Sequence, residues 1–366
     1  MAAHPLSGAD LATLGRVFRE GGRPDRLARA AAIWGAAIGR SPHSALERLV
    51  MDPRLPRAED LPPPVFILGH WRSGTTHLYN VMSRGEWAWV PPVATGLPWD
   101  LFGIVRALRP VLERQLPETR YIDNIPVTPE SPQEDEIALA NMSPLSFYHG
   151  IYFPRAFDRL IDRGVFLDGC SEAEIAEWET RFTYFLRKIA HLFGKPLLIK
   201  NPTYTARPAQ LARLFPGAKF IHIHRNPFDV FLSMRNFHRR LLAELALQDP
   251  PEGLDIDATI LRVYARMMRA YDAQTAGWDA PRLVELPYDL LDRQPMEALA
   301  RIHEGLELPG FAAAEPAFRA YLASVESYAK NAFRGDRAAV EKVSAACAPW
   351  IERHGYAVPE PMQGAT

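Results

Sequence analysis

The segment VFILGHWRSGTTHLYNVM, residues 65–82, decides the predicted fold. Its first five residues form a short apolar run that follows prolines and ends at a glycine, as a buried strand does. After the loop, Leu78, Val81 and Met82 recur at helical spacing. A strand, a glycine-containing loop and a helix are therefore predicted in direct succession.

The loop GHWRSGTT, residues 69–76, is predicted to bind an anion. Its backbone amides can curl around an anion, and the helix that follows presents unsatisfied amides and the positive end of its dipole. A nucleoside triphosphatase loop reads GxxxxGK[ST], with the lysine on the outer phosphates. Here Thr75 stands at the lysine position, and the cation is Arg72 inside the loop. The pattern favours an anion other than a magnesium-bound triphosphate.

The rest of the chain alternates strands with helices. Strands are predicted at 195–200, 218–225 and 282–288, and helices at 174–193, 206–215, from 226 onward, 257–277, 295–306, 315–325 and 338–353. This alternation predicts an α/β fold with three layers, α/β/α, around a mainly parallel sheet. Because the loop after the first strand resembles a phosphate-binding loop, the expected fold is P-loop-like. The predicted domains are a helical extension with a linker (1–60), a main domain (61–358) and a tail (359–366).

The net charge, the two cysteines and the longest apolar stretch each limit what the protein can bind and where it can be located. The chain has 366 residues, 48% of them hydrophobic, and a net charge of -1, so no basic surface for nucleic acid is expected. Cys170 and Cys347 make neither a disulfide framework nor a zinc site, which fits a reducing compartment and predicts a cytoplasmic location. The apolar stretch 27–39 is interrupted by Arg29 and is too short to span a bilayer. Peripheral membrane contact through the N-terminal helices and a homo-oligomer both remain open.

A second segment, KFIHIHRNPFDVFLSM (residues 219–234), predicts a phosphate site. Arg225 ends the predicted strand, and Ser233 follows it by eight residues, about two helical turns, so both lie on roughly the same face. A guanidinium there offers bidentate contact to phosphate. Residues 219–240 hold five Lys or Arg against one acidic residue, Asp229, so the positive charge is local.

Together, the two segments resemble the sulfotransferases that use 3'-phosphoadenosine 5'-phosphosulfate (PAPS), in particular bacterial ones. The stretches LLIKNP (197–202), VELPYDLL (284–291) and MSPLSFYHG (142–150) extend the resemblance. It implies that the 5'-phosphate binds to Arg72, Ser73, Gly74, Thr75 and Thr76, and the 3'-phosphate to Arg225 and Ser233. It also implies that Tyr288 lies near the adenine and that Lys330 belongs to a late basic segment over the 3'-phosphate.

The catalytic role of Lys200 is predicted from its place at the end of a strand, and the other catalytic roles are implied by the resemblance. Lys200 ends an apolar strand at the edge where open α/β sheets bind ligands, so we expect it to contact the bridging oxygen or the sulfuryl group. Arg72 is expected to stabilise the charge on the departing phosphate. Related cytosolic enzymes carry a histidine base two residues after this lysine, but here that residue is Pro202. A carboxylate, Glu134 or Glu136 ahead of Asp135, is the expected base.

The sequence therefore predicts a sulfotransferase that moves a sulfuryl group from PAPS to a hydroxyl, less favourably an amine, without a metal. The acceptor is expected to be a small molecule, a glycan or a lipid. Two alternatives stay open: a P-loop kinase or nucleoside triphosphatase, which would need a lysine at position 75, and a nucleotide-binding protein without catalytic activity.

Overall fold

The computed structural model describes residues 4–114, 127–326, 337–359 and 362. The chain divides into two compact units. Unit 1 contains Met1–Pro62, Ala88–Ile199 and Arg240–Leu254, and unit 2 contains Pro63–Trp87, Lys200–Arg239 and Asp255–Thr366. The N-terminal residues thus share a unit with later segments. The domain boundaries at 60 and 358 stay predictions.

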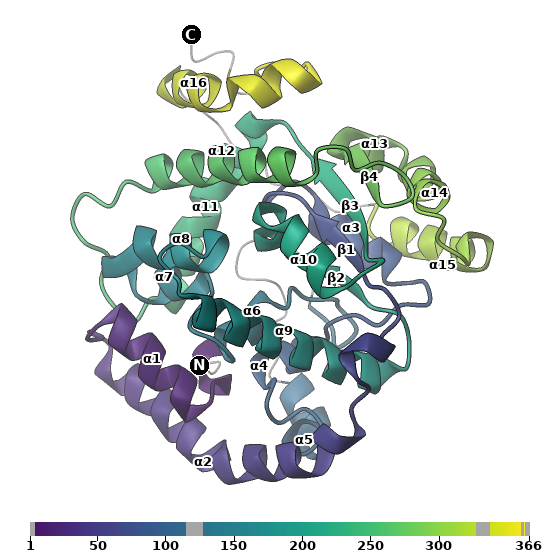
Figure 1. Cartoon of the computed structure of the whole chain (residues 1–366). Coiled ribbons are helices and arrows are strands. Elements are labelled where there is room, and N and C mark those ends of the chain that lie inside the picture. Colours follow the sequence, from purple (N-terminus) through teal and green to yellow (C-terminus); the bar gives the residue numbers. More distant parts are fainter. Residues whose placement is uncertain (1–3, 115–126, 327–336, 360–361, 363–366) are drawn as a thin grey trace. The chain divides into compact units, whose positions relative to one another are not determined.

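The described strands form one sheet in the order β2-β1-β3-β4 (Figure 1). The strands are β1 (Val65–Leu68), β2 (Leu198–Lys200), β3 (Lys219–His224) and β4 (Leu283–Pro287). Both β1 and β4 pair with β3 in parallel. Phe66 and Phe220 are fully buried and stack, with ring centroids 5.7 Å apart. The predicted α/β class with a parallel central sheet is confirmed.

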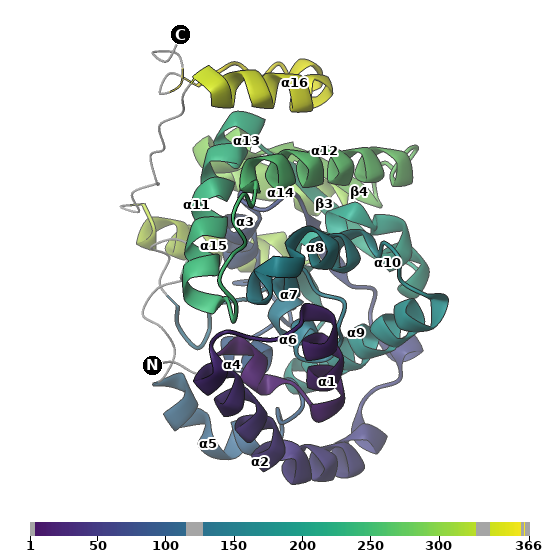
Figure 2. The same cartoon turned by 90° about the vertical axis from the view of Figure 1, so that its left-hand side faces the viewer.

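Most helices of unit 2 begin close to where the sequence predicts them, whereas η5 and α13 were not predicted. They are α3 (Thr75–Met82), η5 (Pro202–Ala206), α10 (Pro208–Leu214), α12 (Ile256–Gln274), α13 (Tyr288–Arg293), α14 (Pro295–Gly305), α15 (Phe311–Ser324) and α16 (Arg337–His354). Helix α11 (Pro227–Leu245) begins in unit 2 and ends in unit 1. Asn226 caps it as predicted, because its Oδ1 accepts from the Phe228 amide at 3.2 Å. Helices α12 and α16 lie side by side in both views (Figures 1 and 2).

The described residues of unit 1 form helices and loops, apart from the first residues of β2. Its helices are η1 (Pro5–Gly8), α1 (Leu11–Gly21), α2 (Leu27–Met51), η2 (Asp52–Arg54), η3 (Ala58–Asp60), α4 (Pro92–Gly96), α5 (Ile104–Glu113), α6 (Glu136–Ala140), α7 (Tyr148–Tyr152), η4 (Pro154–Ala156), α8 (Phe157–Phe166) and α9 (Glu172–Phe193). Helix α2 continues through Pro42, which has no amide hydrogen for the Ile38 carbonyl. The Ser41 hydroxyl donates to that carbonyl instead, at 2.9 Å.

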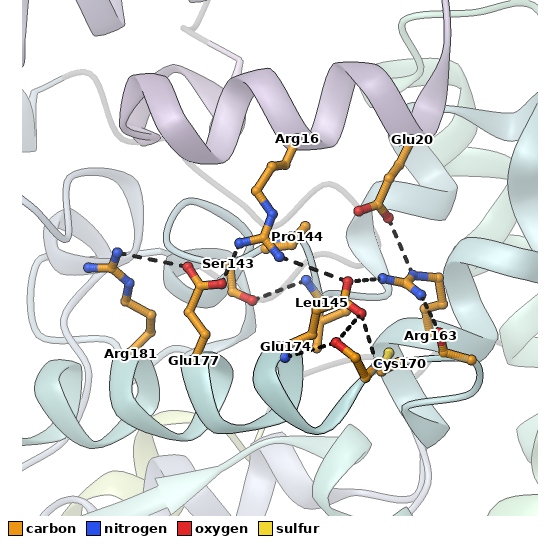
Figure 3. A network of polar contacts seen from close by, with 12 residues as sticks. Arg16, Glu20, Ser143, Pro144, Leu145, Arg163, Cys170, Glu174, Glu177 and Arg181 are labelled. Atoms are coloured by element: carbon orange, nitrogen blue, oxygen red, sulfur yellow. Dashed lines mark hydrogen bonds and ion pairs between the residues drawn. The ribbon is translucent and has the colours of Figure 1, made fainter.

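A network of alternating charges joins α1 to α8 and α9 (Figure 3). Arg16 of α1 pairs with Glu174 at 3.9 Å and with Glu177. Arg163 of α8 pairs with Glu20 at 3.3 Å and with Glu174 at 2.6 Å. Because these groups are partly exposed, each pair contributes modestly, but the shared carboxylates fix the helices relative to one another. Helix α1 is thus joined to α8 and α9 within unit 1.

A buried ion pair connects α9, α2 and the start of α5. Lys188 Nζ donates to Glu47 Oε1 at 2.7 Å and to the Pro98 carbonyl at 2.6 Å. Glu47 Oε2 accepts from the Phe102 and Gly103 amides at 2.9 and 2.6 Å. Burial lowers the pKa of Lys188, and the neighbouring Glu47 carboxylate opposes that shift. Glu47 therefore anchors the two residues just before α5 to α2.

Candidate active site

Three strand ends within unit 2 meet at one edge of the sheet. Leu68 of β1 lies opposite His222 of β3, and His224 lies opposite Pro287 of β4. Since these strands run parallel, the segments that follow them all leave from the same edge. They are the loop that starts at Gly69, Arg225 at the start of the next connection, and Tyr288 at the start of α13. The predicted anion loop and the predicted phosphate segment are therefore adjacent.

The loop after β1 adopts the backbone conformations that an anion-binding turn needs. Gly69, Arg72 and Gly74 have φ angles of 143°, 69° and 101°. A Cβ on Gly69 would lie 2.5 Å from the Ile223 carbonyl oxygen, so only glycine fits. A left-handed conformation at a non-glycine residue such as Arg72 costs about 1–2 kcal/mol. Strain of this kind concentrates at functional sites.

Thr205 of η5 holds the start of this loop. Its Oγ1 accepts a hydrogen bond from the Gly69 amide at 2.8 Å, and both groups are buried. Sequence reasoning missed this residue, because Thr205 is 136 positions away and no local pattern marks it. Its hydroxyl fixes the point where β1 turns into the loop.

The first residues of α3 offer uncapped hydrogen-bond donors to an anion. Gly74 precedes the helix and provides no side-chain cap. Ser73 is buried, and its hydroxyl has no hydrogen-bond partner among the described residues. Thr75 is buried beside it. A phosphate oxygen would satisfy both the Ser73 hydroxyl and the amides at the helix start, so the residues present fit a phosphate group.

Arg72 and Arg225 lie against each other. Arg72 Nε donates to Ser233 Oγ at 2.8 Å, and Arg225 Nη1 donates to the Arg72 carbonyl at 3.3 Å. Arg225 also forms an ion pair with Asp229, one helical turn away, at 3.6 Å. The predicted pair of Arg225 and Ser233 is thus brought together with the loop arginine, and two cations face one small region of unit 2.

Tyr288 packs on both motifs. The Arg225 guanidinium lies 4.5 Å from the centre of its ring. A Cβ on Gly74 would lie only 2.2 Å from a carbon of the same ring, so glycine is required there. Burial raises the pKa of Tyr288 to about 12, against the opposite effect of Arg225. The ring therefore supports the loop and Arg225, whereas its contact with adenine stays a prediction.

Lys200, the last residue of β2, contacts the loop that follows β1. Its side chain is buried, with 2% of the residue exposed, and Nζ donates to Thr76 Oγ1 at 3.2 Å. The next residue, Asn201, caps η5 by accepting from the Thr203 amide and hydroxyl at 3.1 and 2.9 Å. Lys200 and the loop threonine that the sequence assigned to the 5'-phosphate are therefore direct neighbours.

The predicted carboxylates belong to unit 1, and their position relative to the loop is not determined. Glu136 is buried, and its Oε1 accepts from the Ser146 hydroxyl at 2.6 Å and from the Phe147 amide at 3.2 Å. Glu134, just before α6, is half-buried. Glu136 thus has a structural role in unit 1. The remaining predicted residue, Lys330, lies outside the described residues.

His70 is a poor general base despite its place in the loop. Burial lowers its pKa to about 4, against the hydrogen bond that its Nδ1 makes with the Trp71 carbonyl at 2.9 Å. Its ring packs on Tyr264, with centroids 4.9 Å apart. The imidazole is therefore neutral at pH 7, and it would hold an abstracted proton only weakly.

In the described part of the chain, no group of three or more His, Cys, Asp or Glu side chains is placed to hold a metal ion. None of the helices described is both long enough and apolar enough to cross a membrane.

Comparison with known proteins finds relatives that match over most of the chain. The chain is 30% identical over 326 residues to the omega-hydroxy-beta-dihydromenaquinone-9 sulfotransferase Stf3 of Mycobacterium bovis. The aligned residues cover 87% of this chain and 82% of that protein. The Mycobacterium tuberculosis protein of the same name gives the same values.

Solved structures share the fold at lower identity. The sulfotransferase STF9 from Mycobacterium avium superposes with a TM-score of 0.68 at 16% identity, over 97% of this chain and 98% of that one. STF1 from Mycobacterium tuberculosis gives 0.60 at 16% identity, over 93% and 91%. These likenesses confirm the predicted P-loop-like fold. Residues 63–313, which include the anion loop and both arginines, match the sulfotransferase family, and the chain is a member of that family.

Proposed function

We propose that this sulfotransferase uses PAPS as donor and a hydroxyl group of a lipid-like molecule as acceptor. The observation that supports the donor assignment is that Arg225 Nη1 donates to the Arg72 carbonyl, so the residues predicted to bind the 3'-phosphate and the 5'-phosphate are neighbours. The lipid-like acceptor is supported by the relative Stf3, whose name states a hydroxylated menaquinone as its substrate.

In the proposed reaction, the acceptor oxygen attacks sulfur in line with the bridging oxygen. The new bond joins sulfur to the acceptor oxygen, and the bond that breaks joins sulfur to the bridging oxygen of the donor. Adenosine 3',5'-bisphosphate leaves, and the acceptor proton passes to a base. The loop amides and the Ser73 hydroxyl would hold the 5'-phosphate, and Arg72 and Lys200 would stabilise the negative charge that grows on the leaving phosphate. Arg225 and Ser233 would hold the 3'-phosphate.

We propose Glu134 rather than Glu136 as the general base. The Glu136 oxygen already accepts two buried hydrogen bonds, so a Glu136→Gln variant should perturb folding of the segment around α6 and α7. A Glu134→Gln variant should bind the donor product normally and lose turnover, because only proton removal from the acceptor is impaired. Normal turnover in Glu134→Gln would reject this assignment.

The donor is tested by isothermal titration of the purified protein with adenosine 3',5'-bisphosphate and with ATP plus magnesium. We expect binding of the bisphosphate and weak or no binding of ATP. The reverse result would favour a P-loop kinase or nucleoside triphosphatase.

The acceptor class is tested by mass spectrometry of products formed from PAPS with hydroxylated isoprenoid quinones, sterols, phenols and sugars. We expect a sulfated product from a lipid-like alcohol. Bisphosphate binding without a product from any of these acceptors would favour a protein that only binds the nucleotide. No step requires a metal, so turnover should survive EDTA. We keep the cytoplasm as the predicted location.

A further inference from the structure

The exposed face of α2 is almost entirely apolar. Leu27, Ile38, Leu46, Leu49 and Val50 are exposed there, Leu49 to 76%. The other exposed residues between 27 and 50 are alanine, glycine, proline and one histidine; none of the exposed residues of this helix, all of which the structure describes, is Asp, Glu, Lys or Arg. A surface helix of a water-exposed protein normally carries its charges on that face, as α16 does.

Helix α5 continues this feature. Leu108 and Val111 are 49% and 51% exposed, and of the ten residues of the helix only Val105 is buried. Its start is tied to α2 through Glu47, and both views show the two helices next to each other (Figures 1 and 2). We call the exposed side chains of Ile38, Leu46, Leu49 and Val50 on α2 and of Leu108 and Val111 on α5 the α2–α5 surface.

The charges around this surface are mainly positive. Among the described residues in and just after α5, Arg106, Arg109 and Arg114 are exposed, and Glu113 is the one acidic residue. Just after α2, Arg54 and Asp52 are both exposed, and Arg54 lies next to the apolar residues because it donates to the Val50 carbonyl. The acidic residue in this part of α2 is Glu47, and its charge faces inward to Lys188. The exposed ionic groups are therefore mostly arginines beside leucine and valine.

We propose that the α2–α5 surface docks on a lipid bilayer that carries anionic headgroups. Apolar side chains of an interfacial helix enter the boundary between headgroups and acyl chains, and each nearby cation gains from the negative surface potential. The charges disfavour a second copy of this chain as the occupant. A two-fold dimer places the same patch on both sides of the contact, so it would bring two sets of exposed arginines into one interface.

The inference is independent of the proposed donor and acceptor, because the test needs neither. Full-length protein is floated with vesicles of phosphatidylcholine alone and with vesicles of equal parts phosphatidylcholine and phosphatidylglycerol. We expect it to float with the anionic vesicles and to be released by salt, since the arginine contribution is screened. No flotation with anionic vesicles, or equal flotation with both kinds, would overturn the proposal.

Two pairs of variants separate this surface from general effects of charge. Leu49→Glu should lower the partition coefficient by at least about ten-fold, because an apolar group that enters the lipid is replaced by a charged one. Ala317→Glu adds the same charge at an exposed position of α15 and should leave the partition coefficient unchanged. Leu108→Glu repeats the test on α5. Equal effects of Leu49→Glu and Ala317→Glu would contradict the assignment of the surface.

The second pair tests the arginines. Arg109 is 61% exposed and pairs with Glu113 at 2.6 Å, and Arg319 on α15 is 62% exposed and pairs with Glu315 at 2.7 Å, both one turn apart. Arg109→Gln should weaken binding to anionic vesicles about five-fold, whereas Arg319→Gln should not. Gel filtration completes the test: a dimer that Leu49→Glu dissociates, without flotation of the native protein, would assign the surface to a second copy instead.

Discussion

Arg225 offers the sharpest test of the proposed donor site. In the described part of the chain, its guanidinium donates to the Arg72 carbonyl at 3.3 Å, pairs with Asp229 at 3.6 Å and lies 4.5 Å from the centre of the Tyr288 ring. The hydrogen bond and the ion pair are the two polar contacts to compare. The first is long for a hydrogen bond and the second is partly exposed to water, so neither contributes much to holding the loop. The larger expected role of Arg225 is to donate to the 3'-phosphate.

The Arg225→Ala variant should therefore lose affinity mainly for ligands that have a 3'-phosphate. A hydrogen bond to a charged group contributes about 1.5–3 kcal/mol, which corresponds to a loss of about 10- to 150-fold in affinity. Arg225→Lys should fall between the native protein and the alanine variant, because an ammonium keeps the charge but loses the planar fork. Asp229→Asn should bind the bisphosphate slightly more tightly, since it removes a competing anion.

Isothermal titration with two nucleotides measures this directly. Adenosine 3',5'-bisphosphate carries the 3'-phosphate and adenosine 5'-monophosphate does not, so the ratio of their affinities isolates the contact. We expect Arg225→Ala to reduce that ratio by nearly the whole loss. If the variant weakens both nucleotides equally, Arg225 acts by supporting Arg72 and the loop, and the 3'-phosphate assignment is refuted. Unchanged affinity for both would refute it as well.

Three further predictions concern the loop and the folded state. Gly74→Ala should lower the thermal stability and weaken bisphosphate binding, because the added Cβ would lie 2.2 Å from a carbon of the Tyr288 ring. Gly194→Ala is the control, since Gly194 also has a positive φ but no atom lies within 4 Å of the added carbon. It should show only the smaller backbone effect in thermal unfolding and no change in titration. Lys188→Met should lower the free energy of unfolding in urea by about 3–5 kcal/mol, since it leaves the Glu47 carboxylate buried without its cation, and adding Glu47→Gln should recover part of this. If Glu47→Gln restores none of the lost free energy of unfolding, the buried charge of Glu47 is not the cause of the destabilisation. Burial lowers the pKa of His4 from 6.5 to about 4. Between these two pH values the unfolded state therefore binds more protons than the folded state. The stability that neutral His4 provides is present above pH 6.5 and is lost as the pH falls toward 4. His4→Gln should flatten the pH dependence of unfolding in that window, and an unchanged slope would show that other groups control it.

The sequence by itself determined the parts of the protein that local rules encode. Residues 65–82 and 219–245 carry apolar runs, a loop with glycine at the bends and a helix cap, and each feature depends on residues within a few positions of one another. The strand and helix they predict are present, with Asn226 as the cap. The sequence also showed directly that the loop contains Arg72 and that Thr75 stands where a nucleoside triphosphatase has its lysine.

Tertiary structure decided which of these groups meet and which have other roles. The contacts of Arg72 with Ser233, of Lys200 with Thr76 and of Tyr288 with Gly74 join residues more than 100 positions apart. No local pattern encodes them, because they arise only when parallel strands align their ends at one edge. The same holds for the buried hydrogen bonds that Glu136 accepts from Ser146 and Phe147, which no pattern around Glu136 predicts. Sequence periodicity specifies the elements, whereas long-range packing sets the chemical environment of each side chain.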